Sequence, residues 1–158
     1  MKTKALFVGS FDPFHLGHLS VVKRASQLFD SVVIGVAADT NKDTLSIDKR
    51  LHLVNLCIKK YGNLSAIPYG GLTIDLYKSE NANVLIRGVR NIIDFEYEKN
   101  LADINKVLYQ NAQTCLFLCD IGYEISSSLI RQLAKLDADL SKFVPNEIIG
   151  LIKGLYQN

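Results

Sequence analysis

Short apolar runs alternate along the whole chain with longer stretches in which apolar residues recur at helical spacing. The run at 32–37 is apolar throughout, which is typical of a strand buried on both faces of a parallel sheet. The pattern predicts strands at 4–9, 32–37, 63–68, 84–86 and 114–119. It predicts helices at 17–29, 47–61, 73–80 and 94–108, a helix capped by Ser126 that ends near residue 136, and a last helix from Pro145 to residue 156. In the helix at 47–61 we expect the inward-facing residues to be Leu51, Val54, Leu56 and Ile58.

Strands that alternate with helices in this way predict an α/β fold with a doubly wound, five-stranded parallel sheet of the Rossmann-like kind. Each crossover is long enough for a right-handed connection. No change of composition, internal repeat or low-complexity linker divides the 158 residues, so we expect a single domain over 1–158.

The composition is that of a soluble globular protein, with 48% hydrophobic and 22% charged residues. The net charge is +2 and the longest basic runs are pairs, so no tract suggests nucleic acid binding. No apolar run approaches the roughly 20 residues of a membrane span, and we expect no signal peptide. The odd number of cysteines, Cys57, Cys115 and Cys119, argues against a disulfide framework. We therefore expect a cytoplasmic protein with core thiols and neither a nucleic acid nor a membrane partner.

The stretch Gly9-Ser10-Phe11-Asp12-Pro13-Phe14-His15-Leu16-Gly17-His18 joins the first predicted strand to the first predicted helix. It is neither the dinucleotide fingerprint nor the P-loop, but it places backbone N–H groups and a helix dipole where phosphate can bind. His15 and His18 can donate hydrogen bonds to phosphate oxygens that gain charge in a transition state. Two alternatives stay open. His15 can be a polar surface residue, or the pair can ligate zinc, for which the sequence offers no nearby third ligand.

Polar side chains follow every predicted strand, at the edge where parallel sheets bind their ligands. They include Ser10, His18, Lys42, Thr73, Arg87, Arg90, Ser126, Ser127 and Ser128. Arginine forks and a lysine charge suit phosphate oxygens, and serines at a helix start supply hydroxyl and N–H donors. No serine lies in a G-x-S-x-G elbow and we expect no cysteine at this edge, so a covalent nucleophile is missing. The set favours direct phosphoryl or nucleotidyl transfer, in which positioning and charge stabilisation supply most of the rate.

Each of these side chains also has a simpler interpretation. Arg87 or Arg90 can be a surface ion-pair partner, and Ser126 can be no more than an N-cap. Lys42 and Glu98 can be solvated surface residues. The convergence of all five loops on one edge is what favours the functional interpretation.

Several motifs together resemble one known family. They are Gly9-Ser10-Phe11-Asp12-Pro13, Gly17-His18, Val84-Leu85-Ile86-Arg87-Gly88-Val89-Arg90, Asp94-Phe95-Glu96-Tyr97-Glu98 and Ile125-Ser126-Ser127-Ser128. From residue 7 to residue 144 the chain resembles the bacterial phosphopantetheine adenylyltransferases of the HxGH nucleotidyltransferase superfamily. The Arg-Gly-x-Arg segment followed by Asp-Phe-Glu-Tyr-Glu is the most specific part of this resemblance.

The resemblance implies transfer of the adenylyl group of ATP to 4′-phosphopantetheine, with Mg²⁺ present, giving dephospho-coenzyme A and pyrophosphate. It implies a homohexamer, and coenzyme A as a candidate feedback ligand. His18, Lys42 and Arg90 would be catalytic, with His18 stabilising the α-phosphate. The acceptor would be bound by Ser10, Lys42, Thr73 and Arg87. ATP would be bound by Ser10, Phe11, His18, Gly88, Val89, Arg90, Glu98, Gly122, Tyr123, Glu124, Ile125, Ser126, Ser127 and Ser128.

Two departures from the family pattern leave alternatives open. His15 stands where the family usually has a threonine or another polar residue, and His15-Leu16-Gly17-His18 looks more like the nicotinate-nucleotide adenylyltransferases. The loop before Ile125 is about two residues shorter than usual, which affects the adenine-side contacts of Gly122 to Glu124. A rival enzyme therefore uses nicotinate or nicotinamide mononucleotide as acceptor, and a rival of another class is a non-catalytic nucleotide-binding sensor. The helix at 94–108 can cover its own sheet or pack between subunits.

Overall fold

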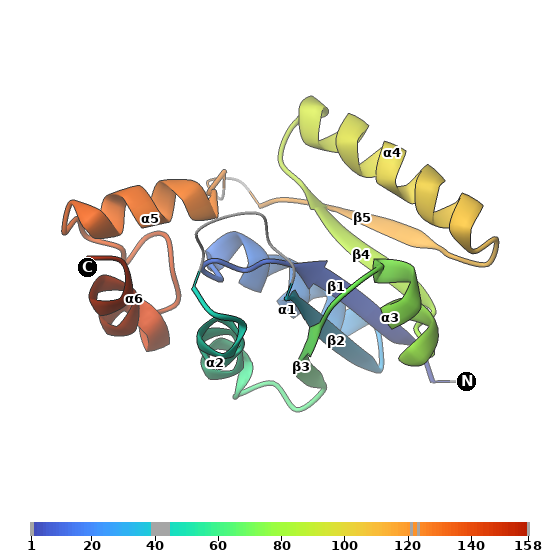
Figure 1. Cartoon of the computed structure of the whole chain (residues 1–158), viewed down its shortest axis with the longest axis horizontal. Helices are drawn as coiled ribbons and strands as arrows, with labels where there is room; N and C mark the ends of the chain where they lie inside the picture. The colour runs from blue at the N-terminus through green and yellow to red at the C-terminus, as the bar shows by residue number, and fades with distance from the viewer. Residues whose placement is uncertain (1, 39–44, 121, 123, 158) are drawn as a thin grey trace.

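The computed structural model describes residues 2–38, 45–120, 122 and 124–157. Five parallel strands form one sheet in the order β3-β2-β1-β4-β5 (Figure 1). The strands are β1 Lys4–Gly9, β2 Ser31–Ala37, β3 Leu64–Tyr69, β4 Val84–Val89 and β5 Thr114–Leu118. The helices are α1 Leu16–Leu28, α2 Ile47–Ile58, α3 Thr73–Ser79, α4 Ile92–Leu108, α5 Ser127–Lys135 and α6 Ile149–Tyr156, the last preceded by the 3-10 turn Asn146–Ile148. The predicted α/β fold with a five-stranded parallel sheet is confirmed.

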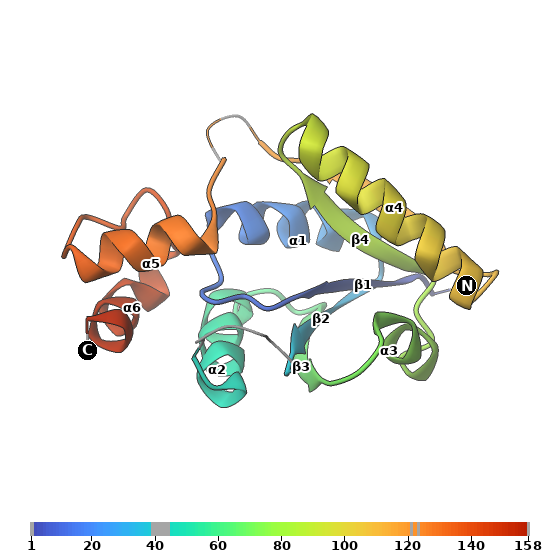
Figure 2. The same cartoon turned by 45° about the horizontal axis from the view of Figure 1, so that its top comes forward.

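The central strand β1 is buried on both faces, because its successive side chains point to opposite sides and a hydrophobic core covers each side. Ala5 and Phe7 of β1 belong to a large core with residues of α1, α2, α5 and α6. Leu6 and Val8 belong to a smaller core with residues of α3. Figures 1 and 2 show α5 and α6 together at the end of the molecule remote from the N-terminus. Among the residues that the structure describes, no helix has the length and apolarity of a membrane span.

Helix starts are set by capping side chains, which explains most differences from the predicted boundaries. His15 caps α1, so the helix begins at Leu16 rather than at residue 17. Asn91 accepts a hydrogen bond from the backbone N–H of Asp94, and α4 therefore begins two residues earlier than predicted. Ser46 and Ser126 cap α2 and α5 as expected. Helix α2 ends at Ile58 rather than at residue 61, and α6 follows the 3-10 turn instead of starting at Pro145.

Strand β4 is twice as long as the sequence pattern suggests and runs to Val89 instead of residue 86. It continues because Arg87, Gly88 and Val89 stay paired with β5. Gly88 also allows a close approach to α1, since a Cβ atom there would lie 3.3 Å from the side chain of Val21. Arg87 is therefore a strand residue and does not lie in the loop after the strand.

Candidate active site

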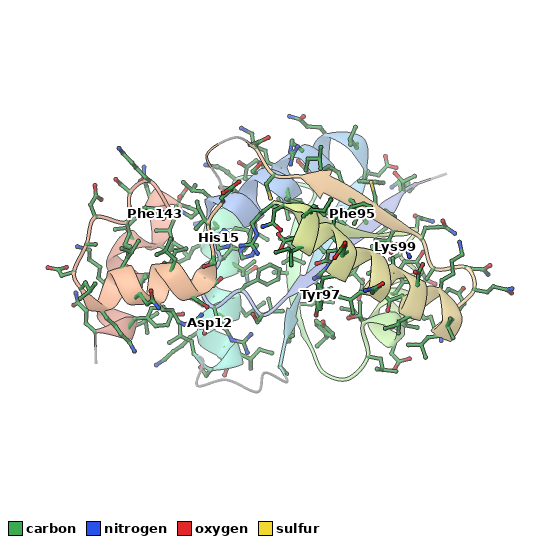
Figure 3. All side chains as sticks on the ribbon, turned by 90° about the horizontal axis from the view of Figure 1, so that it is seen from above. Asp12, His15, Phe95, Tyr97, Lys99 and Phe143 are labelled. Atoms are coloured by element: carbon green, nitrogen blue, oxygen red, sulfur yellow. The ribbon has the colours of Figure 1, made fainter. Side chains whose placement is uncertain are left out.

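A cavity of about 420 Å³ opens at the carboxyl ends of β1 and β4. The strand order reverses between these two strands, which is where open α/β sheets bind ligands. The turn after β1 and the start of α1 form one part of the lining, β4 and α4 a second, and the start of α5 a third. Viewed from above, His15 lies between α4 and α5 (Figure 3).

Side chains from distant parts of the sequence bind the carbonyl groups of the turn after β1. Arg131 Nη1 donates to the carbonyl of Asp12 over 2.6 Å, and Ser127 Oγ donates to that of Pro13 over 2.9 Å. The Asp12 carboxylate is buried and accepts from Tyr156 of α6 over 2.5 Å. The turn that carries Ser10 is thus fixed by α5 and α6, which come from the far end of the chain.

The two imidazoles of the cavity cap each other. The backbone N–H of His15 donates to Nδ1 of His18 over 3.2 Å, and the backbone N–H of His18 donates to Nδ1 of His15 over 3.3 Å. The rings are stacked with centroids 3.5 Å apart, and the Phe11 ring meets His18 edge-on at 5.0 Å. Because both Nδ1 atoms accept, each neutral ring carries its proton on Nε2. His15 is buried and does not behave as a free surface residue.

Both imidazoles are neutral at physiological pH. Burial, followed by the charge of Arg90, lowers the pKa of His15 from 6.5 to about 3. Burial also holds the pKa of His18 well below its ordinary value, with further contributions from His15, Arg90 and Arg87. The pair can therefore offer hydrogen bonds from Nε2 to a phosphate, but it is not a pair of cations.

Arg90 is fixed in the cavity wall by a carboxylate that the sequence pattern did not single out. Its Nε and Nη2 atoms donate to Asp94 over 2.7 and 3.2 Å, and Nη1 donates to the carbonyl of Ile125 over 3.2 Å. The bond to Asp94 raises the pKa of Arg90, and the same bond lowers the pKa of Asp94. The guanidinium thus links α4 to the segment that leads into α5.

Arg87 lies at the junction of the first cavity and a second one. Its Nε and Nη2 atoms donate to the buried Glu98 over 2.7 and 2.8 Å, and Nη1 donates to the carbonyl of Val8 over 2.7 Å. The second cavity measures about 240 Å³ and has Thr73 in its wall. Both cavities are lined by Val8, Gly9, Ser10, Arg87 and Glu98.

The predicted binding residues divide between these cavities. The second cavity contains three of the predicted acceptor-binding residues, Ser10, Thr73 and Arg87. The first contains most of the predicted ATP-binding residues, namely Ser10, Phe11, His18, Gly88, Arg90, Glu98, Ile125, Ser126, Ser127 and Ser128. The predicted ATP-binding and acceptor-binding residues named here therefore line two neighbouring cavities that share a wall.

The three serines at the start of α5 all have structural partners. Ser126 Oγ accepts from the backbone N–H of Leu129 over 3.1 Å, so Ser126 is the N-cap of α5. Ser127 binds Pro13, and Ser128 Oγ accepts from Arg131 over 3.2 Å. An anion at the start of α5 would therefore be bound mainly by the backbone N–H groups of the first turn and by the helix dipole.

Some predicted residues are not placed in either cavity. Lys42 and Tyr123 lie outside the described residues. Val89 is buried within the sheet, and Gly122 and Glu124 are exposed without lining the first cavity. Their roles toward a nucleotide stay predictions.

The lining residues with polar or sulfur groups that were not predicted as site residues are Asp94, Tyr97, Cys119 and Arg131. The expectation that no cysteine lies at this edge is wrong, because Cys119 directly follows β5 and its sulfur lies beside Gly88. Burial raises the pKa of this thiol, so it is not an activated nucleophile. The spacing of Arg90 and Asp94, four residues apart, was the one available signal for the missed pair.

The described residues offer no ready-made cage of side-chain ligands for a magnesium ion. Within 2–38, 45–120, 122 and 124–157, no three histidine, cysteine or acidic side chains group as metal ligands. The carboxylates that line the first cavity are Asp12, Asp94 and Glu98, and each is paired with an arginine. Each of these carboxylates is therefore already part of an ion pair.

The family to which the sequence belongs defines a class of transferase. The sequence profile of the cytidylyltransferase-like family matches residues 6–133, and the chain is a nucleotidyltransferase of this class. A crystal structure of a Vibrio parahaemolyticus protein, assigned as a nicotinate-nucleotide adenylyltransferase, superposes over 100% of both chains with a TM-score of 0.68 at 21% identity. At that identity the likeness shows the fold alone.

Curated relatives narrow the class further. Phosphopantetheine adenylyltransferase from Lachnoclostridium phytofermentans is 40% identical over 96% of this chain and 94% of its own. The proteins of that name from Vesicomyosocius okutanii and Oenococcus oeni are each 41% identical, over 97% and 95% of this chain and 98% and 96% of their own. The chain belongs to the phosphopantetheine adenylyltransferase family.

Proposed function

We propose that this protein transfers the adenylyl group of ATP to 4′-phosphopantetheine, giving dephospho-coenzyme A and pyrophosphate. The observation that carries the proposal is the wall of Ser10, Arg87 and Glu98 that separates two adjoining cavities. Two substrates bound on either side would meet at this wall. ATP would occupy the larger cavity beside the imidazoles, and the acceptor the smaller one, with its phosphate at Arg87.

The reaction needs no general base, because the acceptor phosphate is largely a dianion at neutral pH, with a second pKa of about 6. One of its oxygens forms a bond to the α-phosphorus of ATP. The bond from that phosphorus to the oxygen bridging to the β-phosphate breaks, and the electron pair leaves with pyrophosphate. No covalent enzyme intermediate is involved.

Four side chains would have separate roles in this transfer. Nε2–H of His18 would donate to an α-phosphate oxygen, which gains charge in the transition state. Arg90, held by Asp94, would neutralise part of the charge on the ATP phosphates. Arg87 would hold the acceptor phosphate together with Lys42, whose assignment rests on the sequence resemblance.

Magnesium enters this proposal as part of the Mg-ATP substrate. The carboxylates of the larger cavity are paired with arginines, so the phosphates themselves would be the principal ligands. We place the reaction in the cytoplasm, where free thiols stay reduced. Coenzyme A contains both the pantetheine arm and the nucleotide, so we propose it as a feedback ligand that competes with both substrates.

Pyrophosphate release from Mg-ATP tests the reaction, with 4′-phosphopantetheine in one assay and nicotinate mononucleotide in a second. We expect turnover with the first acceptor alone. Turnover with the second alone would mean that the His15-Leu16-Gly17-His18 motif is the better guide to the acceptor. ATP binding without turnover in either assay would support a nucleotide sensor instead.

We also propose that the chain self-associates through α4. Glu98 is the one residue of this 17-residue helix that is buried in the single chain. Its exposed apolar side chains are Ile92, Ile93, Phe95, Tyr97, Ile104, Val107 and Leu108. A helix with so much exposed apolar surface needs a partner to cover it, and a second copy of the chain is always present.

The mass of the protein in solution tests this second proposal. We expect light scattering to give a multiple of the 17.6 kDa chain, with six copies being the number that the resemblance implies. A mass of one chain at micromolar concentration would contradict self-association.

A further inference from the structure

Arg50, in the first turn of α2, is a buried arginine that lies outside both cavities. It is 1% exposed, and no carboxylate among the described residues forms a salt bridge with it. Its donors bind main-chain carbonyls instead. Nε donates to Leu45 over 2.8 Å, and Nη1 donates to Ser10 over 2.6 Å and to Ala37 over 2.8 Å.

These three carbonyls belong to three separate segments that meet behind the site. Ser10 follows β1 and lines both cavities, Ala37 ends β2 and lines the smaller cavity, and Leu45 precedes α2. Hydrogen bonds from a guanidinium are strong, and the planar fork fixes their directions. One nitrogen atom therefore sets the position of Ser10 relative to Ala37.

The bond to Ser10 also orients the next peptide group. In a planar trans peptide the C=O and N–H point in opposite directions, so binding the Ser10 carbonyl directs the N–H of Phe11 the other way. Phe11 has φ of +50°, a conformation that a non-glycine residue keeps only where its surroundings impose it. The anchors are Arg50 on the carbonyl before Phe11 and Arg131 on the carbonyl of Asp12.

We propose that Arg50 is a positioning residue for the two-substrate site. It keeps the Ser10 carbonyl away from the bound phosphates, maintains the left-handed turn at Phe11 and fixes the wall between the cavities. The naming of the cavities as ATP and acceptor sites rests on the proposed function, whereas the positioning of Ser10 and Ala37 does not.

Arg50→Lys tests the proposal, because lysine keeps the charge but its single nitrogen cannot bind the Leu45 carbonyl and also hold Ser10 and Ala37 in the plane of a guanidinium. We expect kcat/KM to fall at least tenfold. The KM for the phosphopantetheine acceptor should rise more than the KM for ATP, since Ala37 lines the acceptor cavity but not the ATP cavity. Val54→Ala is the matched control, a buried residue of the same helix with no bond to the site. It should keep both KM values while losing stability.

Hydrogen exchange supplies a readout that does not depend on activity. In Arg50→Lys we expect at least tenfold faster exchange in peptides covering 9–14 and 36–38, and unchanged exchange at 114–118. Unchanged exchange in both of the first two peptides of the folded variant would overturn the proposal. If the wild type failed to use 4′-phosphopantetheine, the proposed function would fail while the exchange data still decided the role of Arg50.

The wild-type protein provides a second test if the variant does not fold. In native-state exchange under mild denaturant, amides of 9–14 and 36–38 should open as one cooperative unit, because one guanidinium joins them. Opening of these two segments at clearly different denaturant concentrations would overturn the proposal.

Discussion

In the proposed reaction, the neutral imidazole of His18 is the main side chain that stabilises the transition state. His18 is held by a backbone hydrogen bond, a stacked ring and an aromatic contact, so its Nε2–H is oriented before any substrate binds. We expect His18→Ala to lower kcat/KM by about 10²- to 10³-fold, because a fixed donor to a developing charge is lost. ATP affinity measured by calorimetry should change by less than about threefold. A kcat/KM near that of the wild type would show that His18 does not contact the reacting phosphate.

The stacked imidazoles also make stability depend on pH. The pKa of His15 is lowered to about 3 in the folded state, so its contribution is fully present above its ordinary pKa of 6.5 and is lost as the pH falls below that value. From pH 7 to pH 5 the loss amounts to about 2 kcal/mol for this one group. His15→Thr and His15→Asn both retain an N-cap and cannot titrate in this range.

Urea unfolding at the two pH values measures this effect. We expect the drop in unfolding free energy between pH 7 and pH 5 to be about 2 kcal/mol smaller in both variants than in the wild type. A drop of the wild-type size in both variants would mean that His15 is not held neutral by burial.

Single residues show where sequence-based prediction of the site succeeds and where it stops. His18, Arg87 and Arg90 could be predicted because they lie at or beyond the carboxyl ends of strands, and these ends meet at one edge of a parallel sheet. Their partners could not, since the sequence does not say that Glu98 pairs with Arg87 and Asp94 with Arg90. Those choices depend on side-chain directions that the alternation of strands and helices leaves undefined.

The start of α5 combines two functions that single substitutions can separate. Ser126→Ala removes the N-cap and should lower the unfolding free energy by about 1 kcal/mol. Ser126→Asp restores a cap with a carboxylate, so stability should stay close to that of the wild type. The added negative charge should nevertheless raise the KM for ATP at least roughly tenfold by repelling its phosphates. A wild-type KM for ATP in Ser126→Asp would place the phosphates away from α5.

Helix α2 shows a limit of periodicity as a guide to the core. Val54 and Ile58 are buried as predicted, but Leu53 and Cys57 are buried as well, while Leu51 and Leu56 are only half-buried. The inward face is rotated because Arg50 also points inward, toward three carbonyls. A pattern that counts only apolar residues cannot anticipate a buried guanidinium.

The architecture as a whole was accessible from the sequence because apolar runs and helical stretches alternate without interruption. A continuous run such as the one at 32–37 can be satisfied only by burial on both faces, which requires helices on both sides of the sheet. The outer face of α4 is different. Its apolar residues fit equally well against the chain's own sheet or against another subunit, and the structure shows that the single chain leaves them exposed.

That exposed face leads to a prediction about assembly. Val107 is 87% exposed in the single chain, where a substitution by glutamate would change stability by no more than about 0.5 kcal/mol. If another subunit covers it, Val107→Glu places an unpaired charge in an apolar interface, and the assembly should dissociate toward the 17.6 kDa chain. Leu28→Glu is the matched control, since Leu28 is 69% exposed on a different helix, α1.

Melting temperature provides the second measurement of the same prediction. The Tm of an assembly rises with protein concentration by mass action, whereas that of a monomer does not. We expect a concentration-dependent Tm for the wild type and for Leu28→Glu, and a lower, concentration-independent Tm for Val107→Glu. A Val107→Glu protein with the wild-type mass and Tm would show that α4 stays exposed to solvent, and its apolar face would then need another explanation.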